Sequence, residues 1–275
     1  MNYDKIFKDE VLDILEKEYK IKAENIEKNE ESTDGNVFVI YGKKDKYIMK
    51  IYDSIEHTHA VVKLYYFLER HSIIAPKIVN NKEDSGYIIF KGKFIVVTTF
   101  VEGKHIAWDN GKGRFKEDTI KKIAKELRKL HEKTQDCDDL GLPKLTFGKK
   151  MSRNSVLHFD LTKHNIFINK YEKIGFIDFD DAKYGASVCD VAIIISMLFF
   201  SKTNGANLED SNRFISDYYG KDYELKKIET PVIKEFCLEW LNYLLHKNQF
   251  DTSTQESFEV RRNLINESKL FLWII

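Results

Sequence analysis

The chain has 275 residues with a formal net charge of zero, and 43% of its residues are hydrophobic and 32% charged. That apolar content is enough to bury the core of one large domain or of two lobes. The balanced charge excludes the strongly basic surface typical of proteins that bind nucleic acid or anionic membranes. The longest strongly apolar run, residues 191–200, is about half the ~20 residues that a membrane helix needs.

The N-terminal segment and the cysteines indicate the compartment. MNYDKIFKDE is too charged for a signal peptide. The three cysteines are far apart in the sequence and form no CxxC pair, which favours free thiols in a reducing environment. We therefore expect a cytoplasmic protein.

The first hundred residues mix helical patterns with strand patterns. The helical segments repeat apolar residues three and four positions apart, and Pro76 ends the second of them. The strand segments are apolar runs joined by polar or glycine-containing turns. The expected elements are a helix at 5–19, strands at 37–41 and 47–52, a helix at about 57–71, and a hairpin at 87–100 that turns at 91–93.

The rest of the chain has mainly helical patterns. Residues 117–134 predict an amphipathic helix, and two short strands are expected at 166–169 and 174–177. From about residue 187 to the end the pattern is helical throughout. The fold class is therefore α+β, with a β-rich lobe over residues 1–100 and a mainly helical lobe over residues 101–275.

The segment HFDLTKHNIFINKYEKIGFIDFDD, residues 158–181, concentrates oxygen-bearing side chains. If its two strands pair as an antiparallel hairpin, Asn165 and Asp178 meet at the open end. Asp160 lies in the loop that leads to that end. Carboxylate and amide oxygens of this kind are suitable ligands for Mg²⁺.

The spacing of these residues is that of a kinase catalytic loop, in which H-x-D-x-x-x-x-N is followed by a metal-binding aspartate. Here the residues are His158, Asp160, Asn165 and Asp178. Lys50, the one charge inside the apolar strand YIMKIY, stands where a kinase lysine binds the α- and β-phosphates.

Two features argue against a protein kinase. Phe159 occupies the position where many regulated protein kinases carry an arginine that binds a phosphorylated activation loop. Only eleven residues separate Asp178 from Asp190, too few for a segment that docks a peptide. The substrate is therefore expected to be a small molecule.

The sequence resembles the aminoglycoside phosphotransferase and choline kinase family, in the bacterial branch that includes homoserine-kinase-like and antibiotic kinases. HFDLTKHN, IDFDDAKYG, Asp190 in VCDVA, LRKLHEKT and FVEG carry the resemblance. It implies a protein-kinase-like two-lobe fold. It also implies Mg²⁺-assisted transfer of the ATP γ-phosphoryl group to a hydroxyl of a small acceptor, aminoglycoside-like, an amino alcohol or related.

The resemblance also implies roles for residues of the catalytic loop. Asp160 would be the catalytic base that orients and deprotonates the acceptor hydroxyl. Asn165 and Asp178 would hold Mg²⁺, with Asp180 assisting through water. His158 and Asp190 are expected to be structural, since they would satisfy backbone groups of the loop.

The nucleotide-binding residues are expected mainly in the first lobe. Lys50 would hold the phosphates, which the polar turn from Ser32 to Asn36 would cover through its backbone amides. The carbonyl of Thr99 and the amide of Val101 would bind the adenine edge of ATP. The sequence does not decide between ATP and GTP.

Two departures from the family concern the partner of the lysine and the acceptor site. Val61 stands where relatives often have a glutamate that pairs with the lysine, and Glu56 is a candidate substitute. Only about twenty residues lie between the helix ending near Thr134 and His158, which predicts an acceptor site that is more open or is closed mainly by the C-terminal helices. Trp240, Tyr243 and Trp273 are read as core residues rather than cation-binding faces.

Two other functions stay open. A metal-dependent phosphohydrolase would use His158, Asp160, His164 and Asp178 as metal ligands, but that reading leaves Lys50 unexplained. A catalytically inactive nucleotide-binding protein of the kinase-like class would account for the missing glutamate.

Overall fold

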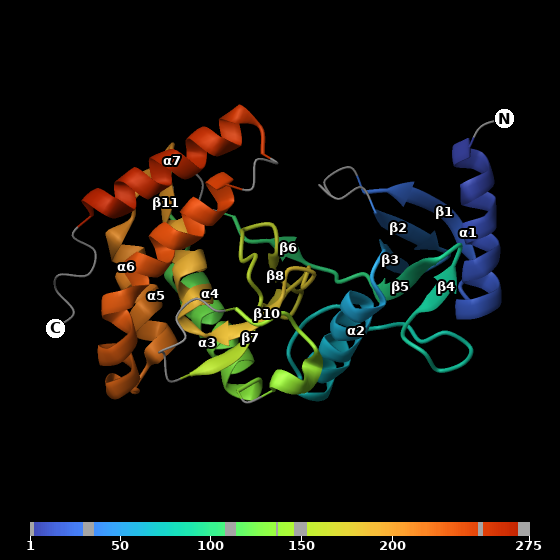
Figure 1. Ribbon diagram of the computed structural model, residues 1–275, viewed down its shortest axis with the longest axis horizontal. Helices are drawn as coiled ribbons and strands as arrows, with labels where there is room; N and C mark the ends of the chain where they lie inside the picture. The colour runs from blue at the N-terminus through green and yellow to red at the C-terminus, as the bar shows by residue number, and fades with distance from the viewer. Residues whose placement is uncertain are drawn as a thin grey trace. The chain divides into compact units, whose positions relative to one another are not determined.

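The computed structural model has two compact units, Met1–Glu102 and Gly103–Ile275 (Figure 1). The first is rich in strands and the second is mainly helical, which confirms the α+β prediction. Among the described residues, no helix is both long enough and apolar enough to cross a membrane. The described residues are 3–29, 36–107, 114–135, 137–145, 153–246 and 250–268.

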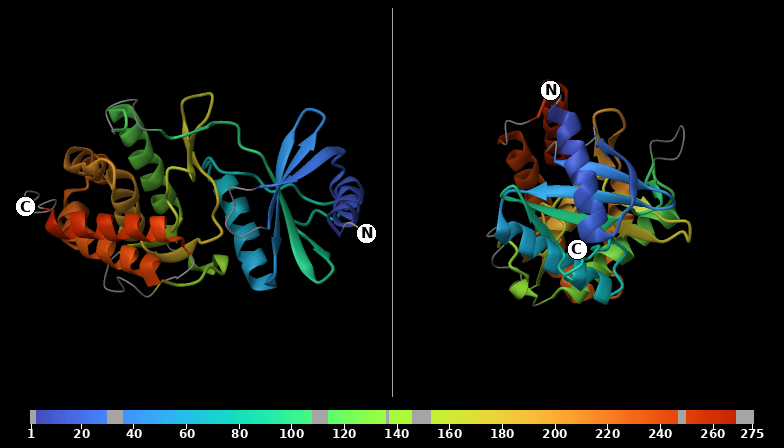
Figure 2. Two further views of the ribbon diagram at one scale, coloured as in Figure 1. Left: turned by 90° about the horizontal axis from the view of Figure 1, so that it is seen from above. Right: turned by 90° about the vertical axis from the view of Figure 1, so that its right-hand side faces the viewer.

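The N-terminal unit contains a five-stranded antiparallel sheet in the order β1-β2-β3-β5-β4. Helices α1 and α2 lie on opposite faces of this sheet (Figure 2). The bounds are α1 Tyr3–Tyr19, β1 Ala23–Lys28, β2 Val37–Gly42, β3 Lys46–Tyr52, α2 Ile55–Arg70, β4 Ile88–Phe90 and β5 Lys93–Thr99.

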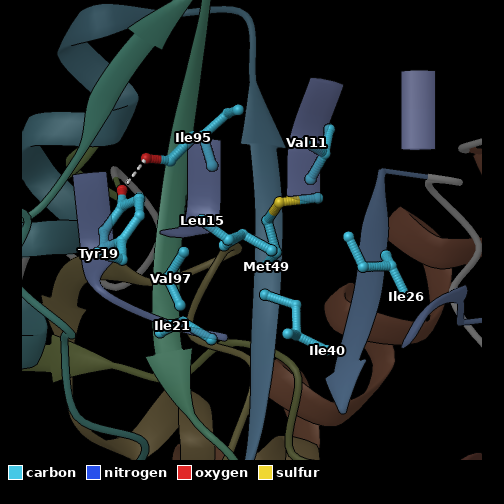
Figure 3. Close-up of a cluster of buried hydrophobic side chains, with 9 residues drawn as sticks. All are labelled: Val11, Leu15, Tyr19, Ile21, Ile26, Ile40, Met49, Ile95 and Val97. Atoms are coloured by element: carbon cyan, nitrogen blue, oxygen red, sulfur yellow. Dashed lines mark hydrogen bonds between the residues drawn. The ribbon is translucent and has the colours of Figure 1, made fainter. Parts of the chain in front are cut away.

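The core of this unit forms between α1 and one face of the sheet (Figure 3). Val11, Leu15 and Tyr19 are four residues apart and therefore share one side of the helix. They pack against a buried face that includes Met49. The Tyr19 hydroxyl donates a hydrogen bond of 3.0 Å to the carbonyl of Ile95, so its polar end is satisfied inside the core.

Both predicted hairpins of this unit form. The turn between β4 and β5 is Lys91-Gly92, and both residues have positive φ, 50° and 77°, as a type I′ turn requires. Strand β1, however, was not predicted. Its sequence AENIEK buries only Ile26, so the charged residues around it hide the strand pattern.

The C-terminal unit is mainly helical and contains three small sheets. One sheet has three strands, β6-β8-β9, and the other two are the strand pairs β10-β7 and β11-β12. The bounds are β6 Lys104–His105, α3 Glu117–Lys133, a 3₁₀ turn Asp138–Leu140, β7 Asn154–Leu157, β8 Ile166–Ile168, β9 Ile174–Phe176, β10 Lys183–Ala186, α4 Val188–Ile194, a π-helical turn Ile195–Phe199, β11 Phe200–Ser201, β12 Gly205–Ala206, α5 Leu208–Tyr219, α6 Tyr223–His246 and α7 Thr252–Glu267.

The prediction of unbroken helix from residue 187 onward is wrong at one place. The chain leaves α4 through a π-helical turn and then forms the hairpin β11-β12. Gly205 in that hairpin has φ of 68°, a conformation that glycine adopts without steric cost. The polar turn residues before it cannot continue the helix, although the apolar run 191–200 reads as helical on its own.

Helix α3 has the buried face that its sequence predicts. It packs mainly against α5, so its amphipathic face is covered within the C-terminal unit. The buried residues are Ile120, Ile123, Ala124, Leu127, Leu130 and His131.

A carboxyl group is buried in α6. Glu229 is 0% exposed, and the Tyr219 hydroxyl donates to its Oε2 at 2.9 Å. The other oxygen, Oε1, has no hydrogen-bond partner among the described residues. Burial raises the pKa of Glu229 to about 7, although the Tyr219 hydrogen bond and the charge of Arg153 act in the opposite direction.

We expect Glu229→Gln to change how stability depends on pH. Between pH ~4.5 and ~7 the unfolded chain ionises Glu229 while the folded chain keeps it protonated, so wild-type stability falls as pH rises. The variant lacks this loss. Its free energy of unfolding relative to wild type should therefore rise by about 3 kcal/mol across this window and stay level above it.

Urea unfolding of both proteins at a series of pH values measures this difference. A constant difference from pH 4.5 to 8 would show that Glu229 titrates normally.

Candidate active site

The β8-β9 hairpin sets the position of the proposed metal ligands. Ile166 pairs with Phe176, and the amide of Ile177 donates to the carbonyl of Asn165 at 3.0 Å. The antiparallel pairing therefore extends to the open end of the hairpin. Asn165 lies beside Ile177 there, and Asp178 follows directly, as the sequence predicted.

Asn165 connects the hairpin to Asp160. Its Nδ2 donates to Asp160 Oδ2 at 2.7 Å and to the Asp160 carbonyl at 2.9 Å. The amide nitrogen is thus bonded to the proposed base. Oδ1, on the other arm of the amide, is the atom of Asn165 that can ligate a hard cation.

The charges around Asp160 favour a bound cation. Burial and the negative charges of Asp178 and Asp181 raise the pKa of Asp160, whereas His158 and the hydrogen bond from Asn165 lower it. A divalent cation beside these carboxylates would offset their mutual repulsion. Asp181 was not among the predicted site residues, although the consecutive aspartates in IDFDD were a visible signal.

Asp190 holds the backbone just before the proposed base. It lies in the first turn of α4 and is fully buried. Its Oδ2 accepts from the amide of His158 at 2.8 Å, and its Oδ1 accepts from the amide of Phe159 at 3.0 Å. This is the structural role that the sequence predicted for Asp190.

His158 is also bonded on both sides of its ring. Nε2 donates to the carbonyl of Ile177 at 2.8 Å, and Nδ1 accepts from the amide of Asp160 at 3.3 Å. These bonds occupy both nitrogens that a metal ligand would need, which argues against the phosphohydrolase reading. The described residues also contain no group of three or more His, Cys, Asp or Glu side chains that could hold a metal ion.

Phe159 has an unusual backbone for its residue type. Its φ is 64°, a left-handed conformation that costs about 1 kcal/mol in a residue with a Cβ atom. Its buried ring packs edge-on against Trp240 at 4.8 Å between centroids, and Lys183 Nζ lies 4.8 Å from the ring. Aromatic packing between the loop and α6 therefore offsets the strain.

The tryptophans and tyrosine near the C-terminus differ in their surroundings. Trp240 is buried, as expected for a core residue, whereas Tyr243 is 41% exposed. Their rings stack at 5.5 Å. Trp273 lies outside the described residues.

We expect Phe159→Gly to be more stable than Phe159→Ala. Both variants lose about 3–5 kcal/mol of aromatic packing, but only glycine relieves the positive φ, by about 1 kcal/mol. Denaturant unfolding of the two variants measures the difference.

Phe214 is a matched control, because it is fully buried inside α5. There the order should reverse, with glycine about 1 kcal/mol less stable than alanine. The same order at both positions would contradict the strain argument.

The N-terminal unit contains the proposed phosphate-binding lysine. Lys50 is in β3 opposite Val37, next to the core residue Met49. Because successive side chains of a strand alternate, Lys50 faces the side of the sheet away from α1, the side that α2 covers (Figure 2).

The other residues predicted to bind the nucleotide belong to the turn before β2 and to the end of β5. The carbonyl of Asn36 accepts from the amide of Ile51 at 3.1 Å, so Asn36 lies beside the strand that carries Lys50. Ser32 lies outside the described residues. Thr99 is the last residue of β5, and its Oγ1 accepts from the amide of Lys77 at 3.0 Å. Val101 follows two residues later and is half-buried.

The two positions considered for a carboxylate partner of Lys50 are both in α2. Val61 is 1% exposed and belongs to the core. Glu56 lies in the first turn, where its Oε2 accepts from Ser54 Oγ at 2.8 Å. Backbone and Ser54 hydrogen bonds lower the pKa of Glu56, as is common at a helix N-terminus.

Known proteins resemble both the motif segment and the fold. The sequence profile of the phosphotransferase enzyme family matches residues 135–223, the segment that contains Asp160, Asn165, Asp178 and Asp190. No curated protein is significantly similar to the chain in sequence.

Several solved structures share the fold across the whole chain. An amicoumacin kinase in complex with AMP-PNP and Ca²⁺ has a TM-score of 0.70 and 14% identity, covering 98% of this chain and 97% of its own. A spectinomycin phosphotransferase bound to AMP has a TM-score of 0.68 and 12% identity, covering 95% and 99%. A microcompartment-associated aminopropanol kinase has a TM-score of 0.68 and 12% identity, covering 94% and 95%.

These similarities confirm the predicted family resemblance and the kinase-like fold. The profile match identifies the catalytic-loop segment with a family of phosphotransferase enzymes. Together, the matched segment and the fold support a phosphotransferase enzyme.

Proposed function

We propose that this chain, with its phosphotransferase-family catalytic segment, is an ATP-dependent kinase of a small molecule. It would transfer the γ-phosphoryl group to a hydroxyl of the acceptor. The observation that supports this most is the hydrogen-bonded pair of Asp160 and Asn165, with Asp178 at the same end of the β8-β9 hairpin. Phosphoryl transfer depends on positioning and charge neutralisation, which such a group of residues provides.

Each residue of the group has a chemical role in this proposal. Asp160 accepts the proton of the acceptor hydroxyl and orients its oxygen toward the γ-phosphate. Asn165 Oδ1 and the Asp178 carboxylate would hold Mg²⁺, and Asp180 would assist through water. These ligand atoms are all oxygens, which suits Mg²⁺. When bound, Mg²⁺ would neutralise negative charge on the phosphates.

The N-terminal unit would bind the nucleotide. Lys50 would pair with the α- and β-phosphates, and Ser32 and Asn36 belong to the turn proposed to cover them. The Thr99 carbonyl and the Val101 amide would bind the base. GTP remains an alternative donor, because the sequence of the connector does not decide between the two purines.

The acceptor class is proposed from the family. Structural neighbours are named for amicoumacin, spectinomycin and aminopropanol, which supports an acceptor among antibiotics or amino alcohols. At 12–14% identity their acceptors define a panel to test rather than a single compound. Resistance to an antibiotic is the cellular role that would follow from an antibiotic acceptor.

An inactive nucleotide-binding protein is the second candidate. Val61, buried where relatives often carry a glutamate, favours it. Turnover of Mg·ATP with an acceptor separates the two functions, because an inactive protein would bind the nucleotide and not consume it.

We expect Asp160→Asn to abolish phosphoryl transfer while nucleotide binding is retained. The amide is nearly isosteric and can still accept from Asn165, but it cannot take the hydroxyl proton. A fall of at least about 10²-fold in kcat is expected, with the Kd for Mg·ATP within about threefold. The assay is magnesium-dependent ATP consumption with the acceptor panel, beside calorimetric binding.

Asp139→Asn is the matched control, because Asp139 is exposed and belongs to the 3₁₀ turn. It should behave as wild type. Full activity in Asp160→Asn would show that another group is the base.

We expect Asp178→Asn to weaken the response to magnesium. Loss of a charged oxygen ligand should raise the Mg²⁺ concentration for half-maximal turnover by about tenfold or more. Titration of Mg²⁺ at saturating ATP measures this. An unchanged magnesium requirement would place the metal elsewhere.

A further inference from the structure

A chain of buried hydrogen bonds runs from α5 to the catalytic loop. The Tyr218 hydroxyl lies 2.7 Å from His131 Nδ1, and His131 Nε2 lies 3.2 Å from Asp190 Oδ2. Asp190 in turn accepts from the amides of His158 and Phe159. Tyr218, His131 and Asp190 are at most 1% exposed, so water does not compete for these bonds.

The order of donors follows from the chemistry of each group. Burial raises the pKa of Tyr218 well above its usual range, so the hydroxyl keeps its proton and can donate to His131 Nδ1. A neutral imidazole that accepts at Nδ1 carries its proton on Nε2. That proton points at Asp190. The other tautomer would place a lone pair against a buried carboxylate.

The carboxylate that this chain orients controls the backbone beside Asp160. Asp190 bonds the two amides that immediately precede the base, and Phe159 between them has φ of 64°. A strained turn persists only where its surroundings hold it. Rotation of the Asp190 carboxylate would therefore release the turn that directs Asp160 toward Asn165.

We propose that Tyr218 is a positioning residue of the catalytic loop, which acts through His131 and Asp190 on the geometry of Asp160. The effect of this positioning on catalysis rests on the proposed kinase function. Tyr218 was assigned no role from the sequence. Its effect is expected on the rate of transfer rather than on substrate binding.

Tyr219 provides a matched comparison for Tyr218. The two tyrosines are neighbours in α5, both are 1% exposed, and their rings meet edge to face at 4.9 Å. The Tyr219 hydroxyl, however, donates to Glu229 in α6 and has no bond to the loop network. Replacing either by phenylalanine removes one buried hydroxyl, but only the Tyr218 change interrupts the path to Asp190.

The experiment compares Tyr218→Phe with Tyr219→Phe. Both should lower the melting temperature by similar amounts, because each leaves a buried partner unpaired. Tyr218→Phe should reduce kcat about tenfold with both KM values within about twofold of wild type, whereas Tyr219→Phe should keep kcat within about twofold. Similar kcat values in the two variants would overturn the proposal.

A structural measurement decides the question without turnover. Amide hydrogen exchange at His158 and Phe159 should be faster in Tyr218→Phe than in Tyr219→Phe, and ¹⁵N shifts should show the Nε2–H tautomer of His131 in wild type. Equal exchange in both variants, or a His131 ring with its proton on Nδ1 and none on Nε2, would overturn it. If no acceptor of the panel supported ATP consumption by the wild type, the proposed function would fail. The hydrogen-exchange rates alone would then test the positioning role.

Substitutions of His131 give an independent check. Glutamine can still donate an N–H toward Asp190, whereas leucine cannot. His131→Gln should therefore retain more of kcat than His131→Leu at comparable melting temperatures. Equal kcat values for the two variants would contradict the role of the His131–Asp190 bond.

Discussion

The buried carboxylate of Asp190 is the group on which the geometry of the catalytic loop depends. An isolated charge in a protein interior costs several kcal/mol, and this one is stabilised by three N–H donors from two parts of the chain. His131 supplies one donor from α3, and the loop backbone supplies two. The same bonds that stabilise the charge therefore fix the loop against α3 and α4. Asp190 therefore has both a structural role and a role in positioning the loop.

The negative charges grouped around the catalytic loop oppose folding but favour the binding of a cation. Asp160, Asp178 and Asp181 raise one another's electrostatic energy, and a protein selected only for stability would avoid this grouping. The β8-β9 hairpin holds Asn165 and Asp178 together at its open end despite the repulsion. Their separation is thus set by backbone pairing and not by the charges themselves. A rigid hairpin of this kind suits a site whose task is to bind a cation and aligned phosphates.

The sequence predicted the local features of this site and missed the long-range ones. Asn165 and Asp178 could be placed because a short hairpin fixes their positions, and the α3 face could be read from its periodicity. Tyr218 and His131 are 87 residues apart, and His131 and Asp190 are 59 residues apart, so no local sequence pattern predicts these hydrogen bonds. Strand β1 was missed because its exposed residues are charged. The buried Glu229 was missed because an acid in a helix normally faces water.

The strained backbone of Phe159 is part of the structure of the site. In the sequence, Phe159 stands out only because it replaces the arginine of many protein kinases, since the identity of a residue does not reveal its backbone conformation. In the structure its backbone is strained, its amide is bonded to Asp190, and its ring packs on Trp240 of α6. The loop is therefore attached on two sides, by its backbone to α4 and by a side chain to α6. A glycine at this position would remove the strain and also the second attachment. The strained phenylalanine thus couples the turn before Asp160 to the long helix α6.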